Sequence, residues 1–452
     1  MQKVILSLPI IGKFLSARPM LLRVVENISW LSLDKVIRMG VGLFVGVWVA
    51  RYLGPAGYGM LNYAVAFVSL FSALATLGLD QIVVRELVHT PENEGKLVGT
   101  SFFLKLIGGI LVLFLSTLTA FFIHKGDLKT ILMIFFVSLG MVAQAFLAID
   151  FFFQSKILSK YTVIAQNTAF FAVSLLKVLL ILMSQSVEWF AIMSVFEAFI
   201  AGVFLVFFYN RKGGHISCWK FDIATAKKLL LDSWPLILSS VAITIYMRVD
   251  QVMIRNMLGE REVGWYSAAV SLTEAFWIIP GMIMNSIFPV LVQSKKESEQ
   301  LYYDRLQWSY VIMLLMGLSI GIIVAISSTQ IVKILYGKEF SPTSDILKIY
   351  VLATIIIFWG APTSKWSVIE NLQKLSFSRT MIATFVNVLL NFFLIPIWQG
   401  FGAALATIFA QFVSAIGINL FDKRTKKITL IMLKSFLLMF NFKKIFLFWK
   451  FK

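Results

Sequence analysis

Long apolar runs constrain this sequence more than any other feature. An α-helix needs about 20 apolar residues to cross the hydrocarbon core of a bilayer. Because a backbone in lipid must satisfy its hydrogen bonds internally, runs of this length predict helices. The sequence therefore predicts an all-α polytopic membrane protein with about 12 transmembrane helices, at residues 28–50, 61–80, 98–123, 130–153, 162–184, 189–209, 234–258, 264–289, 308–329, 346–366, 379–397 and 401–421.

The composition excludes an ordinary soluble domain. Hydrophobic residues make up 59% of the 452 residues and charged residues only 14%, whereas soluble domains carry roughly 25% charged residues. The net charge of +18 is explained by basic cytoplasmic loops, so we expect no nucleic-acid partner. Cys218 is the single cysteine, and the three histidines fall in separate predicted loops. The sequence accordingly predicts neither an intramolecular disulfide nor a metal site or cofactor.

The basic residues of the connections are distributed unevenly. The N-terminal segment, every second connection and the exit from the last span carry 22 Lys and Arg, a set that includes Arg379, whereas the alternate connections carry 7. Lys and Arg concentrate on the cytoplasmic side of membrane proteins. Both chain termini are therefore expected in the cytoplasm, which agrees with an even number of spans.

A weak internal repeat coincides with a basic stretch in the middle of the chain. The segment ARYLGPAGYGMLNYAV (50–65) resembles RNMLGEREVGWYSAAV (255–270), so that Gly54 matches Gly259 and Gly59 matches Gly264. Paired glycines at this spacing indicate a tight turn that needs positive φ or close backbone approach. The repeat therefore predicts two six-helix lobes, related as a parallel pseudo-repeat, around a central cavity. Alternating-access transporters have this arrangement.

This repeat defines the predicted domains. They are a cytoplasmic N-terminal segment (1–27), an N-lobe (28–209), a basic cytoplasmic linker (210–233), a C-lobe (234–421) and a basic C-terminal tail (422–452). In the tail, ITLIMLKSFLLMFN (428–441) is short for a span and contains Lys434. Two interpretations stay open for it: an interfacial helix, which we favour, and a thirteenth crossing.

Ionisable residues inside the predicted spans are the candidate functional residues, because each costs on the order of 2.5 kcal/mol or more at the bilayer centre. Cations outnumber acids among them, and a cationic cavity wall suits an anionic phosphate or diphosphate group. We predict that the substrate binds to Arg38, Lys177, Arg248, Arg255, Lys105 and Lys35.

The acidic residues of the spans receive a different role. We predict ion coupling or helix pairing for Asp34, Asp250, Glu197 and Glu274. Asp34 and Arg38 are four residues apart and share a helix face, so a pair between them is expected. Asp250 points away from the face of Arg248 and is expected to tie its helix to a neighbour or to carry a proton or cation. Arg255, Asp150 and Lys365 lie near span ends, where snorkelling to the interface is a sufficient explanation.

At this point the sequence resembles a known family. The run SLDKVIRMGVGLFVGVWVARYLGPAGYGMLNYAVAFVSLFSALATLGLDQIVVREL (32–87) is similar to the N-terminal signature of the O-antigen and polysaccharide flippases, of the multidrug/oligosaccharidyl-lipid/polysaccharide exporter superfamily. A second signature is MRVDQVMIRNMLGEREVGWYSAAVSLTE (247–274), and the resemblance covers residues 28–421. Arg38, Arg248 and Asp250 match places where the family carries charge.

The resemblance implies a fold, a substrate and a location. It implies two lobes around a cationic cavity that flip polyprenyl-diphosphate-linked oligosaccharide, such as an O-antigen repeat unit, from the inner to the outer leaflet of a bacterial cytoplasmic membrane. Membrane lipid, a proton or sodium coupling ion and a polysaccharide polymerase are the implied partners, and no ATP site or other cofactor is implied.

Two alternatives remain open. A cation-coupled multidrug exporter of the same superfamily would show an acid-dominated cavity. A membrane polysaccharide polymerase or ligase would present a large outer loop with clustered Arg, His or acidic residues. The outer connections here are short and contain only His124 among the histidines, so we predict that the protein is not an enzyme and has no catalytic residues.

Overall fold

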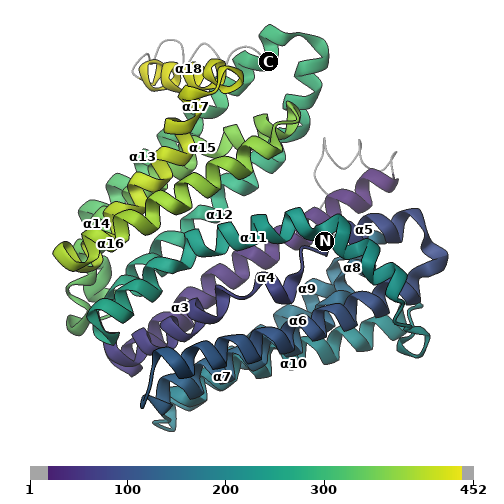
Figure 1. The fold of residues 1–452 in the computed structure, drawn as a ribbon. Helices are drawn as coiled ribbons and strands as arrows, with labels where there is room; N and C mark the ends of the chain where they lie inside the picture. Colours follow the sequence, from purple (N-terminus) through teal and green to yellow (C-terminus); the bar gives the residue numbers. More distant parts are fainter. Residues whose placement is uncertain (1–18, 440–452) are drawn as a thin grey trace. The chain divides into compact units, whose positions relative to one another are not determined.

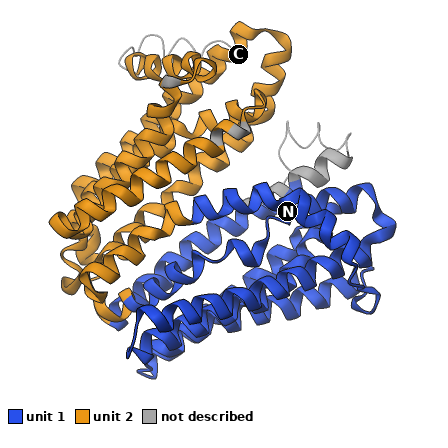
Figure 2. Cartoon of the chain, viewed as in Figure 1, with its two compact units in different colours: residues 1–53, 60–244 blue, residues 54–59, 245–452 orange. Residues whose placement is uncertain are grey.

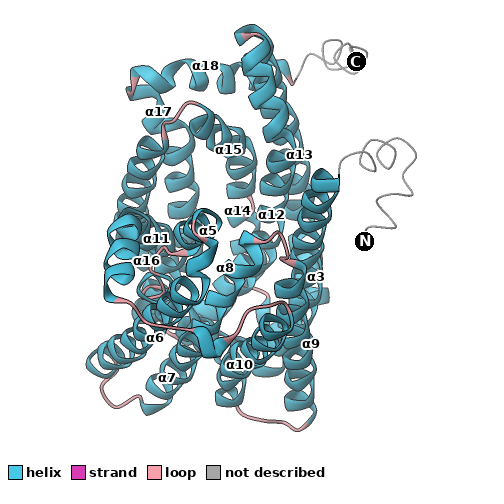
Figure 3. Cartoon of the chain, turned by 90° about the vertical axis from the view of Figure 1, so that its right-hand side faces the viewer, coloured by secondary structure: helices cyan, strands magenta, loops and turns pink. Residues whose placement is uncertain are grey.

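The computed structural model describes residues 19–439. Every regular element among them is helical (Figure 3). In chain order the α-helices are α3 (Pro19–Ser69), α4 (Ala73–Thr76), α5 (Asp80–His89), α6 (Glu94–Ile123), α7 (Leu128–Ala143), α8 (Ala148–Ser155), α9 (Lys160–Leu182), α10 (Val187–Arg211), α11 (Ile223–Leu258), α12 (Glu260–Glu297), α13 (Glu299–Leu335), α14 (Thr343–Tyr350), α15 (Leu352–Ile369), α16 (Gln373–Phe412), α17 (Ile418–Phe421) and α18 (Lys423–Leu438). Short 3-10 helices cover Pro91–Asn93, Gln144–Leu147, Ile216–Cys218 and Lys338–Phe340, and a π-helix covers Val413–Gly417.

Ten helical stretches within residues 19–439 are long and apolar enough to cross a membrane. Two of them, Ser29–Ser69 and Phe377–Leu420, each contain one residue with non-helical backbone, Gly54 and Gln399 respectively. These breaks lie where the sequence predicts connections between spans. The ten stretches therefore carry the twelve predicted apolar runs, and the all-α polytopic fold is confirmed.

Large apolar side chains cover the outside of these helices. Phe44 is 70% exposed, Leu182 74% and Ile326 76%. Water would not tolerate a surface built largely from such groups, whereas lipid is as apolar as they are. The exposed apolar surface therefore agrees with a multi-pass membrane protein.

The second predicted span is not the continuous helix over 61–80 that the sequence indicates. Helix α3 ends at Ser69, α4 is a single turn, and α5 begins only at Asp80. The chain passes through positive φ at Leu77 (53°) and Gly78 (58°). A Cβ on Gly78 would lie 2.8 Å from the Cβ of Leu236, so only glycine allows both this backbone and this approach of α11. Hydropathy could not reveal the break, because the residues around it are as apolar as those of a membrane-spanning helix.

The chain forms two compact units (Figure 2). Unit 1 comprises residues 1–53 and 60–244, and unit 2 comprises residues 54–59 and 245–452. The boundary between residues 244 and 245 lies inside α11, and residues 223–233 of the predicted linker belong to that helix. The lobe and linker bounds of the sequence analysis stay a prediction.

Each unit has its own apolar core. In unit 1, helices α6, α7 and α10 run side by side (Figure 1). Its core includes Leu79, Phe152 and Tyr209, whereas the core of unit 2 includes Tyr310 and Phe358. These cores hold in place the helices that carry the polar groups described below.

The matched glycines of the predicted repeat meet inside unit 2. Gly54 and Gly259 both have positive φ, 64° and 99°. A Cβ on Gly59 would overlap the backbone carbonyl oxygen of Glu260, and a Cβ on Gly264 would overlap that of Pro55. In each repeat the first glycine therefore makes the turn and the second allows the other turn to approach. This confirms both predicted reasons for glycine.

Helix α18 forms the described part of the predicted tail, and the choice between an interfacial helix and a further crossing stays a prediction. The helix has 16 residues, fewer than the ~20 that a crossing needs. Figure 1 and Figure 3 show α18 lying crosswise to α13, and Lys427 Nζ contacts Glu299 Oε1 at 3.0 Å. Residues 1–18 of the predicted N-terminal segment and residues 440–452 of the tail lie outside the described residues.

Candidate functional site

Arg38 on α3 is the centre of an ion-pair cluster in unit 1. Its Nε donates to Asp34 Oδ1 at 3.0 Å, which confirms the predicted pair. Its Nη1 lies 3.6 Å from Glu197 Oε1 on α10, and its guanidinium lies over the Phe170 ring, 5.1 Å from the centroid. Two carboxylates therefore balance this arginine inside the bundle.

Arg248 and Asp250 on α11 contact two different groups of α12 in unit 2. Arg248 Nη2 lies 3.3 Å from Glu274 Oε2. Asp250 is 3% exposed and accepts hydrogen bonds from the Tyr266 hydroxyl and, at 2.8 Å, from the Gln251 backbone N–H. This hydrogen bond from Tyr266 connects α11 to α12, and the role of Asp250 in ion coupling or helix pairing stays a prediction. Arg255 also forms an ion pair, because its Nη2 lies 3.3 Å from Glu260 Oε1.

The three lysines predicted to bind substrate lie in different surroundings. Lys105 on α6 is 6% exposed and lies over the Phe151 ring, with Nζ 5.1 Å from the centroid. Lys177 on α9 is half-buried and Lys35 on α3 is exposed. Over residues 19–439 none of these lysines has a carboxylate within 4.0 Å or a hydrogen-bond partner. Their assignment to the substrate stays a prediction.

Asp150 and Lys365 both have neutral hydrogen-bond partners. Asp150 accepts from Thr162 Oγ1 at 2.5 Å and from Gln154 Nε2 at 2.6 Å. Lys365 donates to Asn285 Oδ1 at 2.5 Å. Snorkelling therefore is not needed to explain either group within the bundle.

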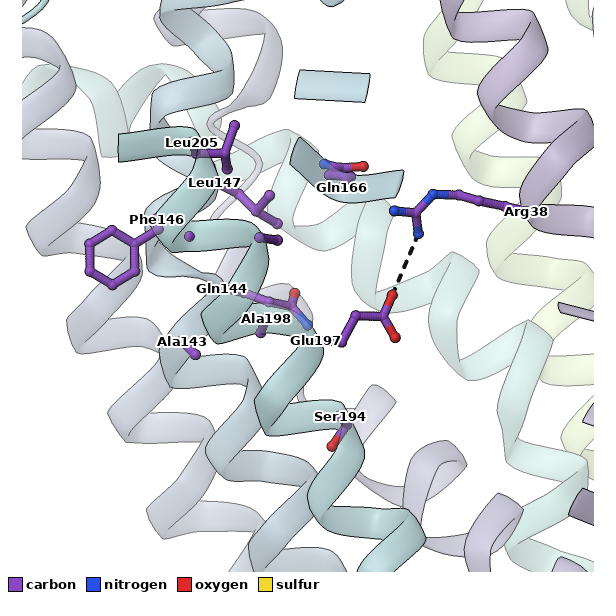
Figure 4. Close-up of a pocket in the computed structure, with 12 residues that line it drawn as sticks. Arg38, Ala143, Gln144, Phe146, Leu147, Gln166, Ser194, Glu197, Ala198 and Leu205 are labelled. Carbon is purple, nitrogen blue, oxygen red and sulfur yellow. Dashed lines mark ion pairs between the residues drawn. The ribbon is translucent and has the colours of Figure 1, made fainter. Parts of the chain in front are cut away.

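Two adjoining cavities lie within unit 1. The first has a volume of 340 Å³ and is lined by Arg38, Gln144, Gln166, Ser194 and Glu197 together with apolar groups (Figure 4). The second has a volume of 280 Å³ and is lined by Thr76, Asp80, Lys105, Gln144, Asp150, Gln154 and Gln166 with four apolar side chains. Gln144, Leu147 and Gln166 line both cavities. Polar groups from eight helical elements thus line two cavities that share three residues.

Two interruptions of helical structure border these cavities. Thr76 lies in the broken stretch between α3 and α5, and Gln144 begins the 3-10 segment between α7 and α8. Irregular backbone at membrane depth is tolerated only where it is buried in protein or lines a water-filled cavity. Discontinuous helices of this kind form the substrate sites of many transporters.

Unit 2 contains a cavity of 330 Å³ that brings Trp277, Pro280 and Gly281 of α12 to Arg379 of α16. Arg379 is 6% exposed, and its Nη1 donates to Asn419 Oδ1 at 2.8 Å. Counting Arg379 with the basic residues of a cytoplasmic connection is therefore wrong. The residue lies inside α16, where the packing of the unit removes it from solvent.

The sequence matches a known family over more than half its length. Residues 24–295 match the family described as polysaccharide biosynthesis protein. The chain belongs to the polysaccharide biosynthesis protein family. This family member is 22% identical over 414 residues to the capsular polysaccharide biosynthesis protein CapF of Staphylococcus aureus, covering 88% of this chain and 99% of CapF. It is 23% identical over 348 residues to a putative O-antigen transporter of Shigella flexneri, covering 73% of this chain and 81% of that protein.

Solved structures show the fold of the family member. The Lipid II flippase MurJ in an inward closed conformation has a TM-score of 0.60 at 18% identity, over 90% of this chain and 91% of MurJ. A multidrug resistance MATE family transporter of the MOP superfamily, in an inward-facing conformation, has a TM-score of 0.72 at 13% identity. That match covers 90% of this chain and 99% of the transporter. The predicted resemblance and the transporter fold are confirmed.

Sequence reasoning missed several cavity residues of this polysaccharide biosynthesis family member. Gln144 and Gln166 lie inside the predicted spans 130–153 and 162–184, where an amide side chain is itself a signal. They escaped because the search followed charge alone. Asp80 was placed at the end of a span, and only the break before α5 brings it to Lys105 and Asp150.

Proposed function

We propose that this protein is a flippase that moves polyprenyl-diphosphate-linked oligosaccharide from the inner to the outer leaflet of the bacterial cytoplasmic membrane. Alternating access of the two lobes carries the headgroup, and a proton or sodium gradient drives the cycle. The observation that carries the proposal is the pair of polar cavities in unit 1, bordered by interruptions of the helices. A passive helix bundle has no use for such a space, whereas a transporter must solvate a polar headgroup while it crosses.

The proposed headgroup ligands are the basic residues predicted from the sequence. Arg38, Arg248 and Arg255 each contact at least one carboxylate. A guanidinium has five N–H donors, so an arginine paired with one or two acids retains donors for an oxygen of the headgroup. In the proposed cycle the headgroup competes with these acids, which would couple headgroup binding to rearrangement of the ion pairs.

Names of relatives support this substrate class and a transport role without catalysis. One relative is called a putative O-antigen transporter and another a capsular polysaccharide biosynthesis protein. In the proposal the protein is no enzyme, both termini lie in the cytoplasm, and a polysaccharide polymerase acts on the flipped product.

A cation-coupled multidrug exporter is the second candidate function. It is favoured by the likeness to MATE transporters and by the acids around the unit 1 cavities, Asp80, Asp150 and Glu197. This candidate predicts sensitivity to toxic cations, and not a defect in surface glycan, when the gene is lost.

The test is deletion of the gene in its own host, followed by measurement of where polyprenyl-diphosphate-linked oligosaccharide accumulates. The proposal expects accumulation on the cytoplasmic leaflet, which the wild-type gene reverses. Normal levels of lipid-linked sugar with a new sensitivity to ethidium would overturn the proposal in favour of the drug exporter.

A further inference from the structure

The two adjoining cavities of unit 1 have a charge balance that does not match a diphosphate. The charged side chains that line them are the bases Arg38 and Lys105 and the acids Asp80, Asp150 and Glu197. Acids therefore outnumber bases around this space. A dianionic group placed there would face repulsion from at least one unbalanced carboxylate.

Two side-chain amides in the cavities have no partner within residues 19–439. Gln144 and Gln166 line both cavities, and neither amide makes a hydrogen bond to another described residue. Figure 4 shows both side chains facing the same space as Arg38 and Glu197. Each amide offers one acceptor oxygen and two N–H donors. Polar groups inside proteins normally have partners, so these amides are prepared for a ligand or for water.

Lys105 provides an independent observation at the second cavity. Its side chain is more than nine-tenths buried, it lines the cavity together with Asp80 and Asp150, and its ammonium lies over the face of Phe151 with no hydrogen bond to another described residue. Its ammonium has three N–H donors and no acceptor. Burying such a group without a hydrogen bond is unfavourable, and a ligand oxygen in the cavity would relieve this.

A sugar residue matches this set of groups. Each of its hydroxyls both donates and accepts, as the amides require, and a neutral ring suffers no repulsion from the three acids. Phe146, Leu147 and Phe151 supply apolar wall for the C–H faces of the ring. The cavity volumes of 340 and 280 Å³ lie near the lower end of the roughly 300–1,000 Å³ typical of small-molecule sites.

We propose that these cavities bind the saccharide part of the transported headgroup, with Gln144, Gln166 and Lys105 hydrogen-bonded to sugar hydroxyls. This inference rests on the proposed flippase function and names the place where the sugar, as distinct from the diphosphate, is recognised. The diphosphate is bound by basic residues that do not line these cavities, whereas Arg38 belongs to the sugar site.

The test uses the full chain in lipid nanodiscs and two probes. One probe is the free oligosaccharide repeat unit purified from the host, and the other is polyprenyl diphosphate without sugar. The variant is the double substitution Gln144→Leu and Gln166→Leu, which removes amides that have no hydrogen-bond partner among the described residues and so should leave folding intact. Gln411→Leu, the same change in the cavity of unit 2, is the matched control.

We expect the free repeat unit to stabilise the wild type and the control in thermal unfolding. The double variant should bind it about 30-fold more weakly, since each lost hydrogen bond to a neutral ligand contributes roughly 1 kcal/mol. Affinity for polyprenyl diphosphate should be equal in all three proteins. A Gln166→Leu single variant, whose residue lies in the regular helix α9, tests the same point if the double variant unfolds.

Two results would overturn the inference. If the variant loses affinity for polyprenyl diphosphate and not for the repeat unit, the cavities hold the phosphate groups. If the wild type does not bind the free repeat unit, the cavities do not recognise sugar, although leaflet accumulation in the deletion strain would still support the flippase. If lipid-linked oligosaccharide does not accumulate on the cytoplasmic leaflet of the deletion strain, the proposed flippase function itself fails.

Discussion

Substitution of Gly59 by alanine should weaken unit 2 because two turns meet there without side chains between them. A Cβ on Gly59 would overlap the carbonyl oxygen of Glu260 and lie 2.8 Å from the Gly264 nitrogen. Both obstructing atoms are backbone, so no side-chain rotation can relieve the clash. The two turns must separate until these atoms are at least about 3.4 Å from the new methyl group, the ordinary van der Waals distance.

The magnitude follows from two opposing effects. Forcing a backbone shift in a packed interior costs typically 1–3 kcal/mol, and the upper end applies here because only backbone can move. Replacing glycine by alanine inside a helix returns about 1 kcal/mol of helix propensity. We therefore expect Gly59→Ala to lower the free energy of unfolding by about 2 kcal/mol. Gly264→Ala should cost a similar amount, and the double variant less than twice as much, because both substitutions separate the same two turns.

The assay is thermal unfolding of the purified protein in detergent, followed by tryptophan fluorescence. Gly46→Ala is the control, since Gly46 lies in the helical part of α3 before the break at Gly54 and a Cβ there meets nothing within 4 Å. Helix propensity alone would raise the melting temperature of both variants. If Gly59→Ala melts as high as Gly46→Ala, the contact between the turns does not stabilise the fold and the reasoning is wrong.

Three further predictions concern other parts of the chain. Arg248→Ala should abolish glycan export at unchanged membrane abundance, measured by complementation of the deletion strain; normal export would remove Arg248 from the substrate path. Gly78→Ala should destabilise unit 1 by roughly 1–2 kcal/mol, because alanine meets both a positive φ of 58° and the Cβ of Leu236; an unchanged melting temperature would contradict this. Hydrogen bonds from the Thr225 side chain and backbone N–H, and then from Lys96, lower the pKa of Asp222 to about 2. A lowered carboxyl pKa stabilises the fold above about pH 4, and this stabilisation is lost as the pH falls towards 2. The difference in melting temperature between the wild type and Asp222→Asn should therefore shrink from pH 4 to pH 2. A constant difference would refute the assignment.

Interactions within one helix or one turn could be predicted from the sequence. The pair between Asp34 and Arg38 follows from their spacing of four residues, since a helix places them on one face. The roles of Gly54 and Gly59 followed from their match to the second turn. In both cases the deciding geometry is local, so the residues and their spacing are sufficient.

Interactions between helices could be predicted only as a type of contact. The sequence showed that Asp250 points away from Arg248 and indicated a neighbouring helix as its partner. Tyr266 as that partner, and Glu197 as the second partner of Arg38, depend on how helices pack. The sequence analysis expected an excess of cations because it counted the charged residues inside the spans. The structure places an acid beside each of Arg38, Arg248 and Arg255.

The sequence by itself determined that the protein lies in a lipid bilayer, that its fold is helical, which family it belongs to and that it contains an internal repeat. These depend on the length of apolar runs and on local turns, which any conformation of the chain must respect. Only the tertiary structure decided that the second apolar run is broken before α5, that Arg379 lies inside unit 2, and that Gln144 and Gln166 share a cavity with Lys105. Burial and cavities depend on how helices pack against one another. The hydropathy of one helix does not show which other helices contact it.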